Sequence, residues 1–271
     1  LLLLPGAGGS VIYLAELARQ LHDRSGRPVW GLQAIGLDPA QAIPQRVEEI
    51  AAHYAGVLAR AFPSAPGALI GHSFGALVGY ELARQLVAAG GWETPRLAVL
   101  DNPAPAPAAA SAYAGYDHGA WLLHIATRIG KLNGVTLALT RSELDGLTIP
   151  AQNALLVEGM IRQGLLPAEV TAGYFSRFVD VYRANARAAA DYRPAAALPL
   201  DLLLVRAATG DAELRAADAT APDEPAWGWQ RLTTGRLAVT AAPGTHLTMF
   251  APPAVASLAA AVAEWLGEGS G

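Results

Sequence analysis

Short apolar segments alternate with helical patterns along most of the chain, and this alternation constrains the fold more than any other feature. The expected strands occupy residues 1–4, 29–37, 68–72, 96–100, 200–205 and 237–240. Apolar residues recur at helical spacing in residues 10–21, 44–58 and 74–87, and an apolar helix is expected at 252–266. Strands that alternate with helices favour right-handed crossovers and parallel pairing. The sequence therefore predicts an α/β fold whose mostly parallel sheet carries helices on both faces.

The alternation breaks after residue 101 and resumes at residue 200. Residues 102–199 contain helix-like segments but no convincing strand pattern. These segments lie at residues 121–129, 151–163 and 175–190. We therefore expect a single domain over residues 1–271, with a core formed by residues 1–101 and 200–271 and a large helical lid insertion at 102–199.

Composition excludes several classes of protein. Hydrophobic residues make up 52% of the 271 residues and charged residues 15%, which indicates a globular chain. The net charge of −4, without a cluster of Lys or Arg, argues against binding to nucleic acid or anionic membranes. The apolar run at residues 1–4 is too short for a signal peptide or a membrane span.

The chain has no cysteine and no initiator methionine. The absence of cysteine excludes disulfides and thiolate metal sites, and it fits a reducing compartment, so we expect a cytoplasmic location. A chain that starts inside a predicted strand is expected to be part of a longer polypeptide.

A candidate nucleophile follows the third expected strand. Residues 71–75 read GHSFG, with Ser73 between that strand and a helical pattern. Glycines two residues either side of a serine let strand and helix pass close together, so that the hydroxyl projects from a strained turn. This context predicts that Ser73 is the nucleophile of an acyl-transfer enzyme, whereas a chance motif in a glycine-rich chain would not predict the flanking pattern.

The expected general base is His246, which lies in a loop between the last strand and the last helix. An imidazole in that loop can reach over the carboxyl edge of the sheet. The other histidines, at positions 22, 53, 72, 118 and 124, fit structural roles better. His118 and His124 lack the spacing of a helical metal pair, and we expect no metal site.

Two acids could orient the base. Asp101 ends the strand after the Ser73 helix, while Asp211 follows the next strand in a polar stretch. A carboxylate at the end of a strand is a fixed platform that can hold the tautomer of an imidazole. We therefore favour Asp101 and interpret Asp211 as a solvated loop acid.

An oxyanion hole needs two converging N–H donors. Phe74, directly after the candidate nucleophile, supplies one, and the glycine loop at residues 5–9 supplies the other from Ala7, with Gly8 as the alternative. The same loop could suggest a nucleotide site, but its glycine pattern fails at Val11 and no Gly-Lys-Ser/Thr follows. We therefore expect no cofactor in this domain.

The chain resembles the thioesterase domains that end nonribosomal peptide synthetases, with polyketide thioesterases as close relatives. The resemblance covers nearly the whole chain outside the insertion. It is carried by residues 1–9, 29–33, 71–76, 80–86, 100–105 and 243–246. In that family the acid follows the strand just after the elbow helix, which matches Asp101, although Asn102 replaces an expected serine.

The resemblance implies an α/β-hydrolase fold and a substrate held as a thioester on the phosphopantetheine of an upstream carrier domain. Ser73 would accept the peptidyl or acyl chain, which would leave by hydrolysis or by macrocyclisation. The lid would shield the acyl-enzyme with apolar side chains, although ordinary packing explains many of them equally well. These side chains are Trp121, Leu122, Leu123, Ile125, Leu155, Leu156, Ile161, Phe175 and Phe178. The alternatives are a stand-alone editing thioesterase, a general esterase, or a catalytically silent binding protein.

Overall fold

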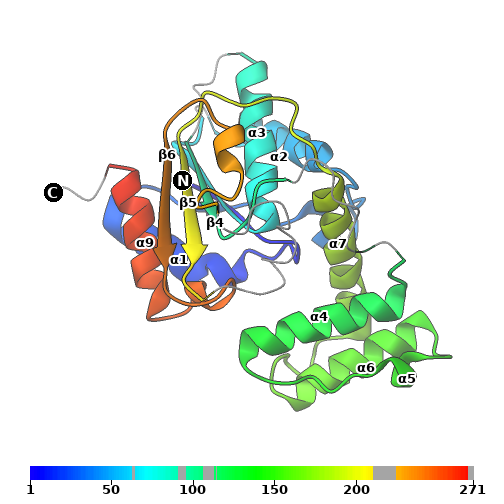
Figure 1. Cartoon of the computed structure of the whole chain (residues 1–271). Coiled ribbons are helices and arrows are strands. Elements are labelled where there is room, and N and C mark those ends of the chain that lie inside the picture. Colours follow the sequence, from blue (N-terminus) through cyan, green and yellow to red (C-terminus); the bar gives the residue numbers. More distant parts are fainter. Residues whose placement is uncertain (63–64, 91–95, 106–112, 114, 210–223, 268–271) are drawn as a thin grey trace.

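In a computed structural model of the chain, six parallel strands form one sheet in the order β2-β1-β3-β4-β5-β6 (Figure 1). The structure describes residues 1–62, 65–90, 96–105, 113, 115–209 and 224–267. The strands are β1 (Leu2–Leu4), β2 (Trp30–Gly31), β3 (Ala68–His72), β4 (Arg96–Leu100), β5 (Leu202–Ala207) and β6 (Leu237–Ala242). The predicted parallel α/β architecture is thereby confirmed.

Helices cover both faces of this sheet. Helices α2 (Val47–Ala61) and α3 (Phe74–Ala88) cover one face, and α1 (Ala15–Ser25) and α9 (Ala254–Trp265) cover the other. The segment between β4 and β5 contributes α4 (His118–Asn133), α5 (Arg141–Leu144), α6 (Ile149–Arg162) and α7 (Ala172–Asp191). Leu2 and Leu4 point into a core beneath α2 and α3, while Leu1 and Leu3 point into a second core beneath α1 and α9. Because side chains alternate along a strand, both faces of each central strand must be apolar to be covered in this way.

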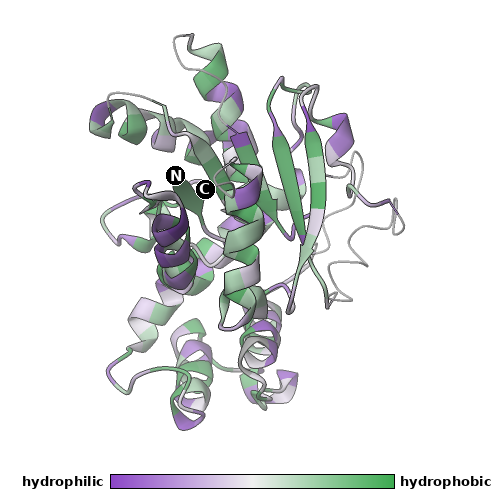
Figure 2. Ribbon diagram, turned by 90° about the vertical axis from the view of Figure 1, so that its left-hand side faces the viewer, coloured by the Kyte–Doolittle hydropathy of each residue, from purple (hydrophilic) through white to green (hydrophobic). Residues whose placement is uncertain are grey.

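The segment between β4 and β5 is helical, and within its described residues it holds no strand. Helices α4, α5 and α6 lie together to one side of the sheet, and α7 runs from them toward α3 (Figure 1). Leucine, isoleucine and phenylalanine side chains of α4, α6 and α7 form a third apolar cluster, and in Figure 2 these helices carry both hydrophobic and hydrophilic residues. Amphipathic helices of this kind stabilise one another by burying their apolar faces.

Several predicted boundaries are wrong. The helix expected at residues 10–21 is a 3-10 turn at Ile12–Leu14 followed by α1 at Ala15–Ser25, and the strands expected at 200–205 and 237–240 end two residues later, at Ala207 and Ala242. The strand expected at residues 29–37 is reduced to β2, and Ile35–Leu37 instead form a 3-10 helix. A Cβ on Gly9 would overlap the side chain of Ala34, so the chain leaves the sheet where it packs on the glycine loop. Helix α2 begins at Val47, three residues after the expected Pro44.

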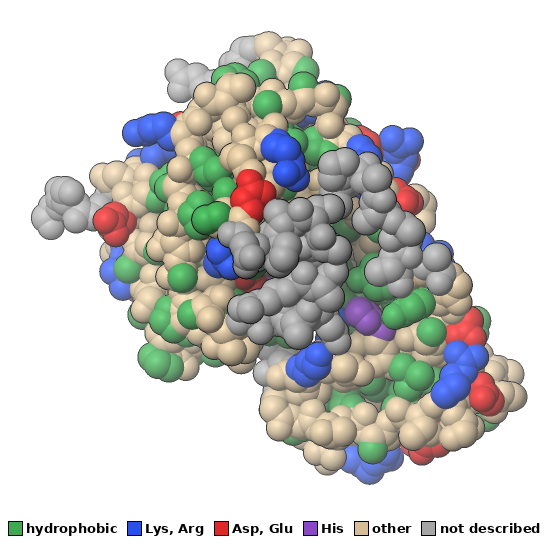
Figure 3. Space-filling view, in the orientation of Figure 1, with side chains coloured by type: hydrophobic (Ala, Val, Ile, Leu, Met, Phe, Trp, Pro, Cys, Tyr) green, Lys and Arg blue, Asp and Glu red, His purple; other side chains and the backbone are tan. Residues whose placement is uncertain are grey.

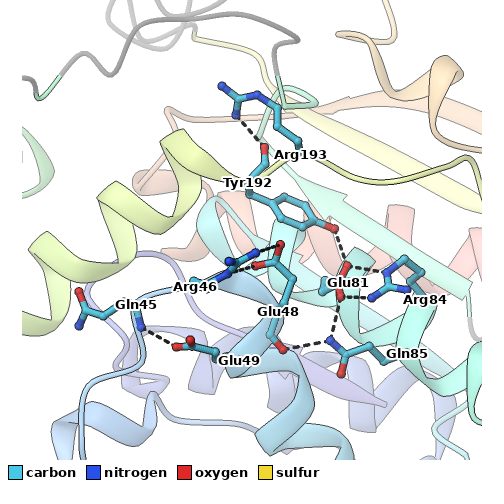
Figure 4. A network of polar contacts seen from close by, with 9 residues as sticks. All are labelled: Gln45, Arg46, Glu48, Glu49, Glu81, Arg84, Gln85, Tyr192 and Arg193. Atoms are coloured by element: carbon cyan, nitrogen blue, oxygen red, sulfur yellow. Dashed lines mark hydrogen bonds and ion pairs between the residues drawn. The ribbon is translucent and has the colours of Figure 1, made fainter.

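A buried carboxylate ties α3 to its neighbours (Figure 4). Glu81, which is 1% exposed, accepts hydrogen bonds from Arg84, Gln85 and the Tyr192 hydroxyl, at 2.6 to 3.0 Å. Gln85 also donates to the Glu48 carbonyl oxygen on α2. Burial alone would raise the pKa of Glu81, but the three donors lower it below the ordinary value.

Charged side chains are scattered over the face seen in Figure 3, where Lys and Arg do not gather into a patch. Among the described helices, none has the length and apolar character needed to span a membrane.

Candidate active site

Ser73 occupies a strained turn between β3 and α3. Its backbone has φ 52° and ψ −125°, a conformation that L-residues rarely adopt. A Cβ on Gly71 would lie 2.5 Å from Ala76 N, and a Cβ on Gly75 would lie 2.6 Å from Pro5 O. Neither position has room for a side chain, as the sequence predicted for a turn at which strand and helix pass close together. The Ser73 hydroxyl makes no hydrogen bond to any described residue.

His246 and Asp101 meet at the carboxyl edge of the sheet. Nδ1 of His246 lies 2.8 Å from Oδ2 of Asp101, and each of the two residues is 2% exposed. The other oxygen, Oδ1, accepts a hydrogen bond of 2.7 Å from the backbone N–H of Ala207 at the end of β5. Because both oxygens are held, the carboxylate has a fixed position toward the imidazole. Like Ser73, Asp101 has a positive φ of 52°.

The candidate oxyanion-hole donors are the N–H groups of Ala7, in the glycine loop after β1, and of Phe74, at the start of α3. Neither the N–H of Ala7 nor that of Phe74 donates a hydrogen bond to a described residue. A bond of 2.9 Å from Gly9 N to Gly6 O fixes the peptide that contains the N–H of Ala7. The buried side chain of Asn185 on α7 donates to the Ala7 carbonyl oxygen at 2.9 Å. No pattern in the sequence indicates a role for Asn185.

Ser73 and His246 line the same pocket, whose volume is about 840 Å³ including its open mouth. The pocket lies between the glycine loop and the helices α4 and α7. Arg128 is the only residue with a formal charge among the described lining residues. The lining is Gly6, Ala7, Gly8, Ser10, Tyr13, His72, Ser73, Arg128, Ile129, Phe178, Tyr182, His246 and Leu247. This composition suits a chain that is mostly apolar.

Tyr13 and His72 also belong to this region, although the sequence analysis assigned neither a role there. The Tyr13 hydroxyl lies 2.8 Å from Gly6 N and 2.7 Å from Nδ1 of His72. Nε2 of His72 lies 3.0 Å from the carbonyl oxygen of His246. A tyrosine beside the glycine loop and a histidine beside the nucleophile were the available sequence signals.

The remaining candidates lie elsewhere. Asp211 falls outside the described residues. His118 contacts the Asn153 side chain at 2.8 Å, and His124 contacts the Tyr182 hydroxyl at 3.2 Å. No group of three or more His, Asp or Glu side chains suited to a metal ion occurs in the described part of the chain.

Packing accounts for most of the apolar side chains expected to shield the acyl-enzyme. Phe178 lines the pocket. The others belong to the apolar cluster of the inserted helices or, for Trp121, to a group of aromatic rings with Tyr113, Tyr116, His124 and Tyr182.

Among curated proteins, the chain is 27% identical over 187 residues to nonribosomal peptide synthetase btyA of Aspergillus terreus, covering 69% of this chain and 20% of that protein. The chain spans about a fifth of the length of the first curated relatives it matches.

Two solved structures share the fold. One is holo-AB3403, a four-domain nonribosomal peptide synthetase bound to AMP and glycine, with a TM-score of 0.81 and 25% identity over 97% of this chain and 19% of that chain. The other is the Vlm2 thioesterase domain bound with a dodecadepsipeptide, with a TM-score of 0.67 and 22% identity over 97% of this chain and 93% of that chain. They confirm the expected α/β-hydrolase fold. The model of the thioesterase domain family matches residues 1–265, so the chain belongs to the thioesterase domain family.

Proposed function

We propose that this thioesterase domain releases a peptidyl or acyl chain from the phosphopantetheine thiol of a carrier domain, with Ser73, His246 and Asp101 as its catalytic triad. The observation that carries the proposal is the buried His246–Asp101 pair at the edge of a pocket that also exposes Ser73. The synthetases among its relatives support a carrier-bound substrate and a place in a longer polypeptide.

In the first half-reaction, His246 removes the hydroxyl proton of Ser73 as the oxygen attacks the thioester carbonyl. Asp101 holds the Nδ1–H of His246, so that Nε2 is the basic nitrogen, and its charge stabilises the imidazolium that forms. The thioester C–S bond then breaks, and the imidazolium returns the proton to the departing thiol. The products are an ester on Ser73 and a free phosphopantetheine thiol.

The N–H groups of Ala7 and Phe74 stabilise the oxyanion of the tetrahedral intermediate. Neither donates a hydrogen bond to another residue that the structure describes, and Phe74 stands at the first position of α3, where the helix dipole also favours negative charge. Gly8 remains the alternative donor from the loop.

In the second half-reaction, water or a nucleophile of the bound chain attacks the ester. His246 again takes the proton of the attacking group and delivers it to Ser73. Water gives a linear acid, and an amine or hydroxyl of the chain gives a ring. Helices α4 and α7 would limit the access of water to this step by covering the pocket. The cytoplasmic location and the absence of a cofactor stay predictions.

The test loads a carrier protein with an acyl thioester and mixes it with the wild-type domain or the Ser73→Ala variant. We expect the wild type to gain the mass of the acyl group and to release the carrier thiol, while Ser73→Ala does neither. A wild type that forms no acyl-enzyme and shows no reaction with a fluorophosphonate would favour a silent binding protein.

Rates on three substrates separate the enzymatic alternatives. The proposal predicts a larger kcat/KM for the carrier-bound thioester than for a small thioester or an oxygen ester with the same acyl group. Equal values on small and carrier-bound thioesters would point to a stand-alone editing thioesterase. The largest value on the oxygen ester would point to a general esterase.

A further inference from the structure

A continuous chain of hydrogen bonds joins the glycine loop to the loop of His246. It runs from Gly6 N through the Tyr13 hydroxyl and the His72 ring to the His246 carbonyl oxygen, with distances of 2.8, 2.7 and 3.0 Å. His72 is 2% exposed and belongs to the strand that delivers Ser73. These hydrogen bonds therefore join the glycine loop, the end of β3 and the loop of His246, and the proposed mechanism depends on the relative positions of these three segments.

The directions of these hydrogen bonds are determined by the two ends of the network. The His246 carbonyl oxygen can only accept, so the ring proton of a neutral His72 sits on Nε2 and is donated there. Nδ1 is then unprotonated and accepts the Tyr13 hydroxyl proton, while the Tyr13 oxygen accepts from Gly6 N–H, which can only donate. No other arrangement of a neutral imidazole satisfies all three contacts.

We propose that Tyr13 and His72 are positioning residues, which hold the Ala7 loop and the backbone of His246 in the geometry that Ser73 needs for acylation. The inference rests on the proposed function and extends it to two side chains that contact neither the thioester carbonyl nor the transferred proton in that mechanism.

A neutral His72 also suits the charge that develops beside it. The centroids of the His72 and His246 rings are 4.5 Å apart. Burial, and next the neighbouring His246, lower the pKa of His72 well below its ordinary value. When His246 takes the proton of Ser73, the resulting imidazolium therefore lies beside a neutral His72 ring. The Tyr13 proton occupies the one nitrogen of His72 that could otherwise accept a second proton.

Packing keeps the two side chains in place. The ring of Phe250 contacts His72 edge to face at a centroid distance of 4.5 Å and contacts Tyr13 at 5.3 Å. Such edge-to-face contacts restrict ring rotation as well as burying apolar area. His72 is therefore held by burial, whereas Tyr13, which is 37% exposed, depends on its hydrogen bonds as well as on Phe250.

The first test compares Tyr13→Phe with the wild type in the rate of Ser73 labelling by a fluorophosphonate, which requires no knowledge of the natural acyl chain. Since small displacements of reacting groups lower rates strongly, we expect a decrease of about tenfold to a hundredfold. Tyr80→Phe is the matched control, because its hydroxyl is also held by two contacts, to Ala196 O and Leu232 O, away from Ser73. Labelling of Tyr13→Phe at the rates of Tyr80→Phe and wild type would overturn the proposal.

The second test separates positioning from general stability at His72. Gln retains an N–H donor that can reach the His246 carbonyl, whereas Leu retains none. Among variants that fold by circular dichroism, we expect His72→Gln to label about tenfold faster than His72→Leu. Equal rates for these two variants would argue against the hydrogen bond to His246.

A third measurement reads the tautomer directly, from the ¹⁵N NMR signals of the His72 ring in the folded wild-type domain. We expect one protonated nitrogen, Nε2, and an unprotonated Nδ1 at neutral pH. A protonated Nδ1 would contradict the deduced directions. A wild type that the fluorophosphonate leaves unlabelled would instead remove the proposed function itself, so the two failures are distinguishable.

Discussion

At the scale of single residues, the candidate site depends on backbone positions that only a constrained fold can hold. Ser73 and Asp101 both adopt φ 52°, and both follow the last residue of a central strand. Ser73 N donates to Leu100 O at 3.1 Å, and Asp101 N donates to Val205 O at 2.8 Å. Hydrogen bonds between adjacent strand ends thus hold the two strained residues in place.

We expect Asp101→Asn to lower kcat/KM by about 10³-fold to 10⁴-fold at neutral pH, because an amide no longer selects the tautomer with a basic Nε2 or stabilises the imidazolium. The assay is hydrolysis of a small acyl thioester. Asp211→Asn is the control and should remain within a few-fold of wild type. An inactive Asp211→Asn beside an active Asp101→Asn would reverse the assignment of the acid.

At the scale of elements, close approach of strand and helix determines which substitutions the elbow tolerates. Helix α3 begins against the end of β1, and a Cβ on Gly75 would overlap the carbonyl oxygen of Leu4. Main-chain atoms of a central strand cannot move aside without breaking the sheet.

Gly75→Ala should therefore unfold the domain or lower its thermal midpoint by many degrees. Gly159→Ala is the matched control, because it lies inside α6, where the nearest atom to the new Cβ is a guanidinium nitrogen of Arg162 at 3.8 Å. Alanine favours helices, so Gly159→Ala should be neutral or stabilise by up to about 1 kcal/mol. Calorimetry of both variants checks this, and a Gly75→Ala variant as stable as Gly159→Ala would contradict it.

The buried Glu81 network makes a prediction about pH. The pKa of Glu81 is lower in the folded state than in the unfolded state, where it is near 4.5. The ionised carboxylate therefore stabilises the fold at pH values above the unfolded-state pKa, and this stabilisation is lost as the pH falls through the folded-state pKa. Glu81→Gln should cost about 1–3 kcal/mol at pH 7, because the neutral amide keeps only one of the two acceptor oxygens and turns an N–H₂ group toward donors of Arg84, Gln85 or Tyr192. The difference from wild type should shrink below about pH 4.5.

Urea unfolding at several pH values measures this difference. Glu16→Gln controls for the removal of one helix carboxylate, since Glu16 is paired with Arg19 at the surface and such pairs contribute little. A difference between Glu81→Gln and wild type that is independent of pH would exclude a role for the ionised carboxylate.

At the scale of the whole molecule, α7 connects the inserted helices to the sheet core. Its aromatic face packs against α4 and α6, while Arg177 on the same helix donates to the carbonyl oxygens of Gly36, Asp38 and Gln41. These acceptors belong to the segment after β2, in which Ala34 N donates to Gly9 O of the glycine loop at 2.8 Å. The helix therefore links the wall of the pocket to the loop that carries Ala7.

Arg177→Ala should speed hydrogen–deuterium exchange in residues 36–41 and 172–191 without changing exchange in α3, and it should cost about 2 kcal/mol of stability. Arg183→Ala is the control, because Arg183 contacts only Asp180 of the same helix within the described part of the chain. Unchanged exchange at residues 36–41 would contradict this link.

The sequence by itself determined the order of strands and helices, the elbow and the positions of its flanking glycines. These features are local, since they follow from periodicity and from the space available around a turn. Ser73 was accordingly predicted from five residues together with the strand and helix patterns on either side of them. The short β2 was missed, because the glycine loop that packs against Ala34 lies 25 residues earlier in the chain.

Only the tertiary structure decided which distant side chains meet. Asp101 and His246 are separated by 145 positions, and the sequence could place each at the sheet edge but could not give their contact of 2.8 Å. Asn185 and His72 were missed because each contacts a backbone carbonyl oxygen far away in the chain. Tyr13 was missed because its hydroxyl meets the ring of His72, which lies 59 positions later. Local sequence determines what a segment can become, whereas packing between layers decides which polar groups are buried together and must satisfy one another.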